Sequence, residues 1–369
     1  MSDSNDSVFE ISGSMAFFGR WIANKPAFWR KVGDIETSIL ADDIAKISIE
    51  KPVYVTGLAR SGSTILLETL AKLPGVATHR YKDFPPVYTP YWWNWFMNVA
   101  GPKEAVAKER AHRDGIMVTH DSPEAMEEVI WMGAFPDIHD PSKNNILDPQ
   151  VRNTEFDRFY DEHIRKLLLS RGAKRYVSKG NYLVSRLDYL LGIYADARFV
   201  VPVRHPEGHI ASLMKQHDLF CRGQENNESA RDHLKRVGHL EFGLDRVPIN
   251  MSNDDVTGSI IELWNNGEEI RGWARYWNLI YDELATRVAG GDNVADAALL
   301  VRFEDLCESP ADIIQGMLDH CGLTAPEGFV AEVAAGIHAP TYYKARFSDA
   351  ELAVIEEETA PARAKLGYD

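Results

Sequence analysis

The stretch "YVTGLARSGSTILLETL", residues 54–70, reads as a short apolar strand, a loop bounded by glycines and the first turns of a helix. Its loop comes close to the nucleotide-binding P-loop, in which Gly, any four residues and Gly precede Lys and then Ser or Thr. Gly57, Gly62 and Thr64 satisfy this pattern, whereas Ser63 stands where the lysine should be. The stretch therefore predicts a strand, a loop and a helix that hold an anion without a P-loop lysine.

The same alternation of an apolar run and a helical pattern recurs along the chain. The four pairs are 53–57 with 62–73, 175–179 with 183–194, 198–203 with 206–217, and 298–303 with 310–321. Alternation of this kind is typical of a parallel sheet covered by helices on both faces. We therefore expect an α/β fold of the P-loop-like three-layer type, with a mostly parallel central sheet and helical lid insertions. Its ligands should bind at the carboxyl ends of the strands.

The length and the breaks in this alternation indicate the domain organisation. A chain of 369 residues suits one large domain or two smaller ones. We expect residues 1–49 to form a helical extension packed on the core, and residues 50–369 to form a single α/β domain. Two long stretches without the alternation, about 81–150 and about 218–270, interrupt that domain. Loops of this length are usually functional, so we expect both to cover the acceptor side of the site.

The composition argues against several classes of partner. With 40 Lys and Arg against 55 Asp and Glu, the formal net charge is -15, which repels nucleic acid. The three cysteines show neither CxxC nor zinc-ligand spacing, so we expect free thiols. The acidic amino terminus does not resemble a secretory signal, and no apolar run reaches the roughly 18 residues of a membrane span. We therefore expect a cytoplasmic protein without a transmembrane segment.

The loop offers more hydrogen-bond donors than a plain turn requires. Backbone amides and the positive end of a helix dipole meet at such a loop and favour a phosphate-like anion. The residues that we expect to contact this anion are Gly57, Arg60, Ser61, Gly62, Ser63 and Thr64. A glycine turn without a ligand is the alternative, and the glycine spacing alone does not decide between the two. The additional Arg, Ser and Thr favour anion binding.

A second candidate anion site lies in "RFVVPVRHPEGHIASLMKQH", residues 198–217. Arg204 leaves the end of an apolar strand, Pro206 suits the first turn of a helix, and Ser212 lies eight residues after Arg204. Both side chains could converge on a second anion near the first. The alternative is a buried ion pair for Arg204 and a surface hydroxyl for Ser212.

These segments resemble the sulfotransferases that use 3'-phosphoadenosine 5'-phosphosulfate (PAPS). The loop "GLARSGST" is similar to the family's 5'-phosphosulfate loop, and "VRHPEGHIAS" is similar to its 3'-phosphate motif. From about residue 50 onward, "RYVSKG", "LLVRFEDLCESPADIIQGMLDHCGL" and the closing "LGY" resemble further family segments in the same order. The resemblance implies a P-loop α/β domain, binding of the 3'-phosphate by Arg204 and Ser212, and catalysis by Lys179 at the bridging oxygen.

The chain departs from the family at the general base. Cytosolic members place a catalytic His after the Lys of the third strand, where this chain has Gly180 and Asn181. Members that act on protein tyrosines or sugar polymers use a carboxylate soon after the second strand, and Asp83 is the nearest residue of that type. We therefore expect Asp83 to act as the base, with His79 and His120 as reserves.

The late Arg-Lys-Gly loop of the family is also missing, and we expect Lys344 and Arg346 to take its place in binding the donor. The resemblance implies in-line transfer of a sulfuryl group from PAPS to a hydroxyl or amine of a carbohydrate or small-molecule acceptor. PAPS has no β/γ phosphate pair, so neither the P-loop lysine nor a metal ion is expected. A P-loop small-molecule kinase and a non-catalytic nucleotide-binding protein are the alternatives. Ser63 disfavours the kinase.

Overall fold

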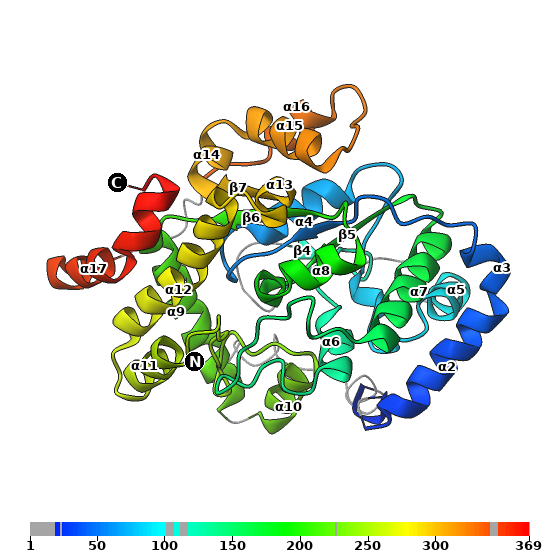
Figure 1. The fold of residues 1–369 in the computed structure, drawn as a ribbon, viewed down its shortest axis with the longest axis horizontal. Coiled ribbons are helices and arrows are strands. Elements are labelled where there is room, and N and C mark those ends of the chain that lie inside the picture. The colour runs from blue at the N-terminus through cyan, green and yellow to red at the C-terminus, as the bar shows by residue number, and fades with distance from the viewer. Residues whose placement is uncertain are drawn as a thin grey trace.

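The computed structural model is built around a five-stranded parallel sheet (Figure 1). It describes residues 19–22, 24–100, 107–110, 117–225, 227–339 and 346–368. The strands run in the order β2-β5-β1-β6-β7, and each is parallel to its neighbours. Their bounds are β1 Val53–Val55, β2 Val76–Ala77, β5 Arg175–Lys179, β6 Arg198–Val203 and β7 Ala298–Arg302. The predicted α/β fold with a mostly parallel sheet is confirmed.

Helices cover both faces of the sheet, which gives three layers (Figure 1). One face carries α4 Ser63–Ala71, α14 Phe303–Glu308, α15 Pro310–Cys321 and α16 Phe329–Ala334. The other carries α7 Thr154–Arg171, α8 Leu187–Ile193, α9 Pro206–Gln224, α12 Glu269–Ala289, α13 Asn293–Ala297 and α17 Asp349–Leu366. Successive strand residues alternate between the faces: Val53 and Val55 join one buried cluster and Tyr54 the other. Burial of both faces explains the continuous apolar runs in the sequence.

The two stretches expected to be insertions contain most of the remaining elements. Between residues 81 and 150 lie the 3₁₀ helix η2 Tyr81–Asp83, α5 Pro90–Ala100, the antiparallel strands β3 Lys108–Glu109 and β4 Met117–Val118, and α6 Glu128–Ala134. The later stretch holds the end of α9, then α10 Glu228–Arg236 and α11 Asp254–Asn265, while η3 Asn181–Ser185 follows β5. The two stretches touch, because a Cβ at Gly238 would lie 2.4 Å from the Glu128 side chain.

The described part of residues 1–49 packs on the core through α2 Pro26–Ile39 and α3 Ala41–Ile44. Glu36 of α2 is buried, lies 3.1 Å from Lys166 Nζ, and accepts a 2.6 Å hydrogen bond from the Trp92 amide. A buried carboxylate needs such partners, so this contact ties α2 to α7 and α5. Among the described helices, none combines the length and the apolar character that crossing a bilayer requires.

Candidate active site

The P-loop-like segment, residues 57–64, joins β1 to α4 at the carboxyl edge of the sheet. The φ angles of Gly57 and Gly62 are 150° and 108°, a region that side chains disfavour. A Cβ at Gly57 would lie 3.1 Å from the Pro202 carbonyl oxygen, and one at Gly62 would lie 2.8 Å from the Phe303 ring. Gly62 is also the N-cap of α4, whose first amides have no intrahelical partner. Glycine is therefore required at both positions, and the segment ends at amides that suit an anion.

Arg60 connects this loop to the second predicted anion motif. Its φ angle of 70° is left-handed, a conformation that costs a residue with a side chain about 1–2 kcal/mol. Strain of this kind is found preferentially at functional sites. Arg60 Nε donates a 3.3 Å hydrogen bond to the Ser212 hydroxyl on α9. The structure thus brings together two residues that the sequence placed in separate motifs.

A buried histidine holds the loop backbone. His209 Nε2 donates to the Ala59 carbonyl oxygen at 2.8 Å, and Trp277 Nε1 donates to His209 Nδ1 at 3.2 Å. Burial lowers the pKa of His209 to about 3, so the ring is neutral with its proton on Nε2. The sequence analysis did not select His209, although it lies inside the quoted segment 198–217. Its partner on α12 could not be found from the sequence pattern.

Two hydroxyls of the loop differ in their surroundings. Ser61 is fully buried, and its hydroxyl has no hydrogen-bond partner within the part of the chain that the structure describes. Tyr281 lies beside it but donates its own hydroxyl to the Pro202 carbonyl oxygen at 3.2 Å. Thr64 accepts a 3.1 Å hydrogen bond from the guanidinium of Arg110. The buried Ser61 hydroxyl suits a ligand oxygen, because buried polar groups normally find a partner.

Arg204 follows β6 and is held beside the loop by an aromatic ring. Its guanidinium lies over the ring of Phe303, 5.0 Å from the centroid, and this is the ring that packs against Gly62. A Cβ at Gly208 would lie 3.4 Å from the same guanidinium, so the first turn of α9 also confines it. Arg204, Ser212 and the loop therefore lie close together, and their binding of a ligand with two anionic groups stays a prediction.

Lys179 ends β5 directly beside the loop. It pairs in register with Val55, and the following Gly180 carbonyl accepts a 2.8 Å hydrogen bond from Thr56 Oγ1. Burial lowers the pKa of Lys179, and the positive charges of Arg110 and Arg60 lower it further. Lys179, Arg60 and Arg110 together favour a bound anion, and the negative charge of that anion would raise the pKa of Lys179 again.

Arg110 was not predicted from the sequence. It follows β3 in the first insertion and is 7% exposed, which is unusual for an arginine. Glu124 from the same insertion and Glu241 from the second insertion raise the pKa of Lys179 and so oppose the effect of burial on that pKa. Both insertions therefore place charged side chains near Lys179.

The residues expected to supply the base have other contacts. Asp83 is buried and accepts hydrogen bonds from Arg171 at 2.6 and 2.8 Å. His79 stacks on His163, with 3.2 Å between their Nε2 atoms, and burial lowers the pKa of His79. The third candidate, His120, lies 3.0 Å from Asp121. None of the three is among the charged groups that act on Lys179. The contacts of Asp83 also suit a structural role, and the assignment of the base to Asp83, His79 or His120 stays a prediction.

The expected substitute for the late cofactor loop falls partly outside the described structure. Lys344 lies outside the described residues. Arg346 is exposed and begins the last described segment, ahead of α17. Their role in donor binding stays a prediction.

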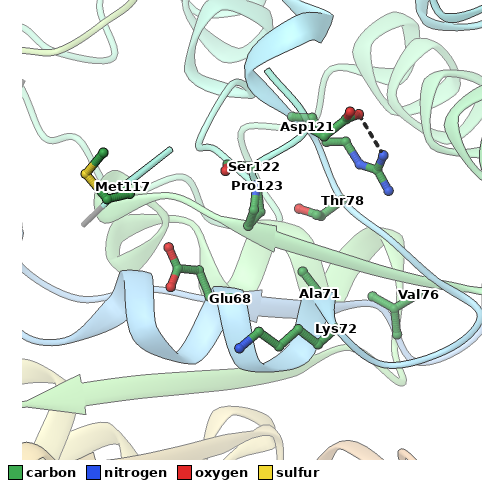
Figure 2. A pocket seen from close by; sticks show the side chains of 10 residues that line it. Glu68, Ala71, Lys72, Val76, Thr78, Met117, Asp121, Ser122 and Pro123 are labelled. Atoms are coloured by element: carbon green, nitrogen blue, oxygen red, sulfur yellow. Dashed lines mark hydrogen bonds and ion pairs between the residues drawn. The ribbon is translucent and has the colours of Figure 1, made fainter. Parts of the chain in front are cut away.

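A cavity of about 310 Å³ lies along the later part of α4, between this helix and the first insertion (Figure 2). Glu68 and Lys72 of α4 form one wall, and Thr78, after β2, faces Pro123 on the other side. The Thr78 hydroxyl is buried and lacks a hydrogen-bond partner among the residues whose positions are described. Pro123 directly precedes Glu124, whose charge acts on Lys179. It is the candidate acceptor side of the site.

Residues 52–244 match the protein family described as the sulfotransferase family. Because this match covers more than half of the 369 residues, the chain belongs to the sulfotransferase family. It is accordingly an enzyme that transfers a sulfuryl group. No curated protein matches the chain.

Three solved structures are similar to this chain at low sequence identity. Sulfotransferase STF1 from Mycobacterium tuberculosis H37Rv is 18% identical over 88% of this chain and 81% of that chain, with a TM-score of 0.45. STF9 from Mycobacterium avium is 13% identical over 89% and 80%, with a TM-score of 0.49. A sulfotransferase from Alicyclobacillus acidocaldarius is 11% identical over 87% and 96%, with a TM-score of 0.41. At these TM-scores, the family assignment depends on the match of residues 52–244.

Proposed function

We propose that this sulfotransferase takes its sulfuryl group from PAPS and passes it to a hydroxyl or amine of a carbohydrate or small molecule. The contact between Arg60 and Ser212, 3.3 Å, carries this proposal. It joins the loop and the β6–α9 motif into one site with places for two anions. PAPS has anionic groups at both its 5' and its 3' positions. An ordinary nucleoside triphosphate has them at the 5' position only.

The side chains at this site fit such a donor. Arg60 and the amides that open α4 would hold the 5'-phosphosulfate, and the buried Ser61 hydroxyl offers one more donor. Arg204 and Ser212 would hold the 3'-phosphate. The positive charge that a P-loop lysine normally supplies comes instead from Arg60, Arg110 and Lys179, which lie close enough to influence one another. Ser63 can therefore stand where the lysine is usual.

PAPS, when bound, supplies the activated sulfuryl group. Lys179 would donate a hydrogen bond to the oxygen that bridges sulfur and phosphorus, where negative charge develops as the bond breaks. Arg60 and the loop amides would stabilise the same charge on the 5'-phosphate. Donors fixed in advance in this way are worth about 3–4 kcal/mol each. The acceptor would approach from the side of the α4 cavity, opposite to the leaving group, as in-line displacement requires.

Calorimetric titration of the purified protein with adenosine 3',5'-bisphosphate, without magnesium and with EDTA, tests this proposal. We expect tight binding of the bisphosphate and weaker binding of adenosine 5'-monophosphate. Arg204→Ala should weaken binding of the bisphosphate about 10- to 150-fold, since a charge-assisted hydrogen bond contributes about 1.5–3 kcal/mol. The affinity for the monophosphate should stay almost unchanged. Equal loss for both ligands, or binding of Mg-ATP in preference to the bisphosphate, would contradict the proposal.

A further inference from the structure

A histidine from the second insertion is fixed close to Lys179 by a chain of polar contacts. His239 Nδ1 lies 2.6 Å from Glu241 Oε2, and the other carboxylate oxygen of Glu241 accepts a 2.7 Å hydrogen bond from Asn181 Nδ2. Asn181 is two residues beyond Lys179 on the same strand end. The intervening Gly180 is bonded through its carbonyl oxygen to Thr56, directly before the loop. The histidine is therefore linked through three short contacts to the donor side of the site.

Further contacts fix this segment of the insertion on η3. The Leu240 amide donates a 2.9 Å hydrogen bond to the hydroxyl of the buried Tyr182. The ring of Phe220 on α9 lies 5.3 Å from the His239 ring, measured between centroids. A side chain whose backbone, ring and Nδ1 are each held in place is preorganised, which catalytic groups require.

We propose that His239 is the general base of the sulfotransfer reaction, and that Glu241 and Asn181 are the residues that position it. This inference rests on the proposed function. Because Glu241 engages Nδ1, the acceptor proton would pass to Nε2. The acceptor oxygen forms its bond to sulfur as it loses this proton, and the bond from sulfur to the 5'-phosphate oxygen breaks. The leaving group is adenosine 3',5'-bisphosphate, whose new charge faces Lys179, and the imidazolium then returns its proton to water.

The charges around His239 favour its protonated form and so make it a stronger base. The groups that act on it are Glu241 on its own segment, Glu124 on the first insertion, Lys179 on β5 and His233 on α10. Burial lowers the pKa of His239, but Glu241 and then Glu124 more than offset it, so the pKa is raised. The pKa of Glu241 is lowered to about 2, chiefly by His239 against the effect of burial. Glu241 therefore stays ionised and stabilises the imidazolium that forms.

This arrangement gives a role to Asn181, the second residue after Lys179. Asn181 lies in the region where cytosolic members of the family place a catalytic histidine. Its amide can donate to Glu241 but cannot accept a proton at neutral pH. The base would instead come from an insertion about 60 residues later, brought back by the Asn181 and Glu241 contact.

The decisive variant is His239→Gln, whose amide can still donate to Glu241 and so preserves the fold. We expect kcat/KM to fall about 10²- to 10⁴-fold, with the loss mainly in kcat. The affinity for adenosine 3',5'-bisphosphate should stay within about twofold of the original protein. His139→Gln is the matched control, because His139 forms a similar 2.7 Å pair with Glu128 on α6. That control should keep its turnover. A normal kcat/KM in His239→Gln overturns the proposal and leaves the donor assignment intact. If the unmutated protein does not bind the bisphosphate, the donor assignment itself is wrong.

The pH dependence separates a base from a residue with only a structural role. Turnover should rise with pH as His239 loses its proton, so the profile has an acidic limb. Glu241→Gln removes the charge that raises this pKa, and the limb should move to lower pH as kcat falls. Asn181→Ala should lower kcat more than it changes KM. Imidazole in the medium should restore part of the turnover of His239→Ala. The proposal is overturned if the acidic limb is unchanged in both His239→Gln and Glu241→Gln. It is also overturned if Glu124→Gln loses turnover while His239→Gln keeps normal turnover.

Discussion

The left-handed conformation of Arg60 predicts opposite effects on stability and on donor binding. With φ at 70°, any residue with a Cβ pays a conformational cost that glycine does not. Arg60→Gly should therefore be more stable to urea than Arg60→Ala by about 1 kcal/mol. Both variants lack the guanidinium, so both should bind adenosine 3',5'-bisphosphate about 10- to 150-fold more weakly, from about 1.5–3 kcal/mol per charge-assisted hydrogen bond.

Urea unfolding of the ligand-free variants and calorimetric titration of the bisphosphate give the two quantities. Lys51 is the matched control, since its φ of 42° is also left-handed and it lies ahead of β1, away from the loop. Lys51→Gly should be more stable than Lys51→Ala, and both should bind the bisphosphate normally. Equal stability of Arg60→Gly and Arg60→Ala would show that the backbone at residue 60 is not strained. Normal bisphosphate binding by either would remove Arg60 from the donor site.

Three further predictions concern groups near the site and in the core. Lys179→Met should lower turnover about 10²- to 10³-fold and bisphosphate affinity less than about tenfold, as single-turnover kinetics and titration will measure. Lys166→Met should lower the free energy of unfolding by about 3–5 kcal/mol, because Glu36 is then left buried without a cation. The loss should shrink as the pH falls and Glu36 takes up a proton, which urea unfolding across pH will check. Asp83→Asn should destabilise the protein by about 3–5 kcal/mol through its pair with Arg171, while turnover per folded molecule stays normal. A large loss of turnover in folded Asp83→Asn would return Asp83 to the catalytic site.

The sheet could largely be predicted because its buried strands are continuous apolar runs. The runs at 53–57, 175–179, 198–203 and 298–303 correspond to β1, β5, β6 and β7. The edge strand β2 is not among these runs, since Val76–Ala77 has only two residues and shows no period, and only the family resemblance indicated a strand ahead of Asp83. Helix ends were less predictable. The pattern expected over 183–194 divides into η3 and α8, and this cannot be read from hydrophobic period alone.

The positions of the residues that we propose for the donor side could be predicted because these residues lie in two short segments. The loop and the β6–α9 motif each lie in one short segment, and parallel strands bring their ends to one edge of the sheet. What the sequence did not show is that Arg60 itself contacts Ser212, a contact between residues 152 positions apart.

For the proposed acceptor side, the sequence indicated the two insertions but not their individual residues. Arg110 and His239 have no motif around them, and only tertiary contacts bring them to Lys179. Asp83 had a suitable residue type for a base, but its partner Arg171 lies 88 positions later in the sequence. The residue type suggested a base, and the contact with Arg171, which suits a structural role, could not be predicted from the sequence.

The central claim is that the loop of residues 57–64 and the β6–α9 motif form one site for a donor that is phosphorylated at both the 5' and 3' positions. The most direct measurement is transfer of labelled sulfuryl from PAPS to a panel of carbohydrate and small-molecule acceptors in EDTA. A parallel reaction contains γ-labelled ATP and magnesium. We predict a labelled product from PAPS without metal, lost in Arg204→Ala, and no labelled product from ATP. Labelled product from ATP alone, or transfer from PAPS that is unaffected in Arg204→Ala, would contradict the claim.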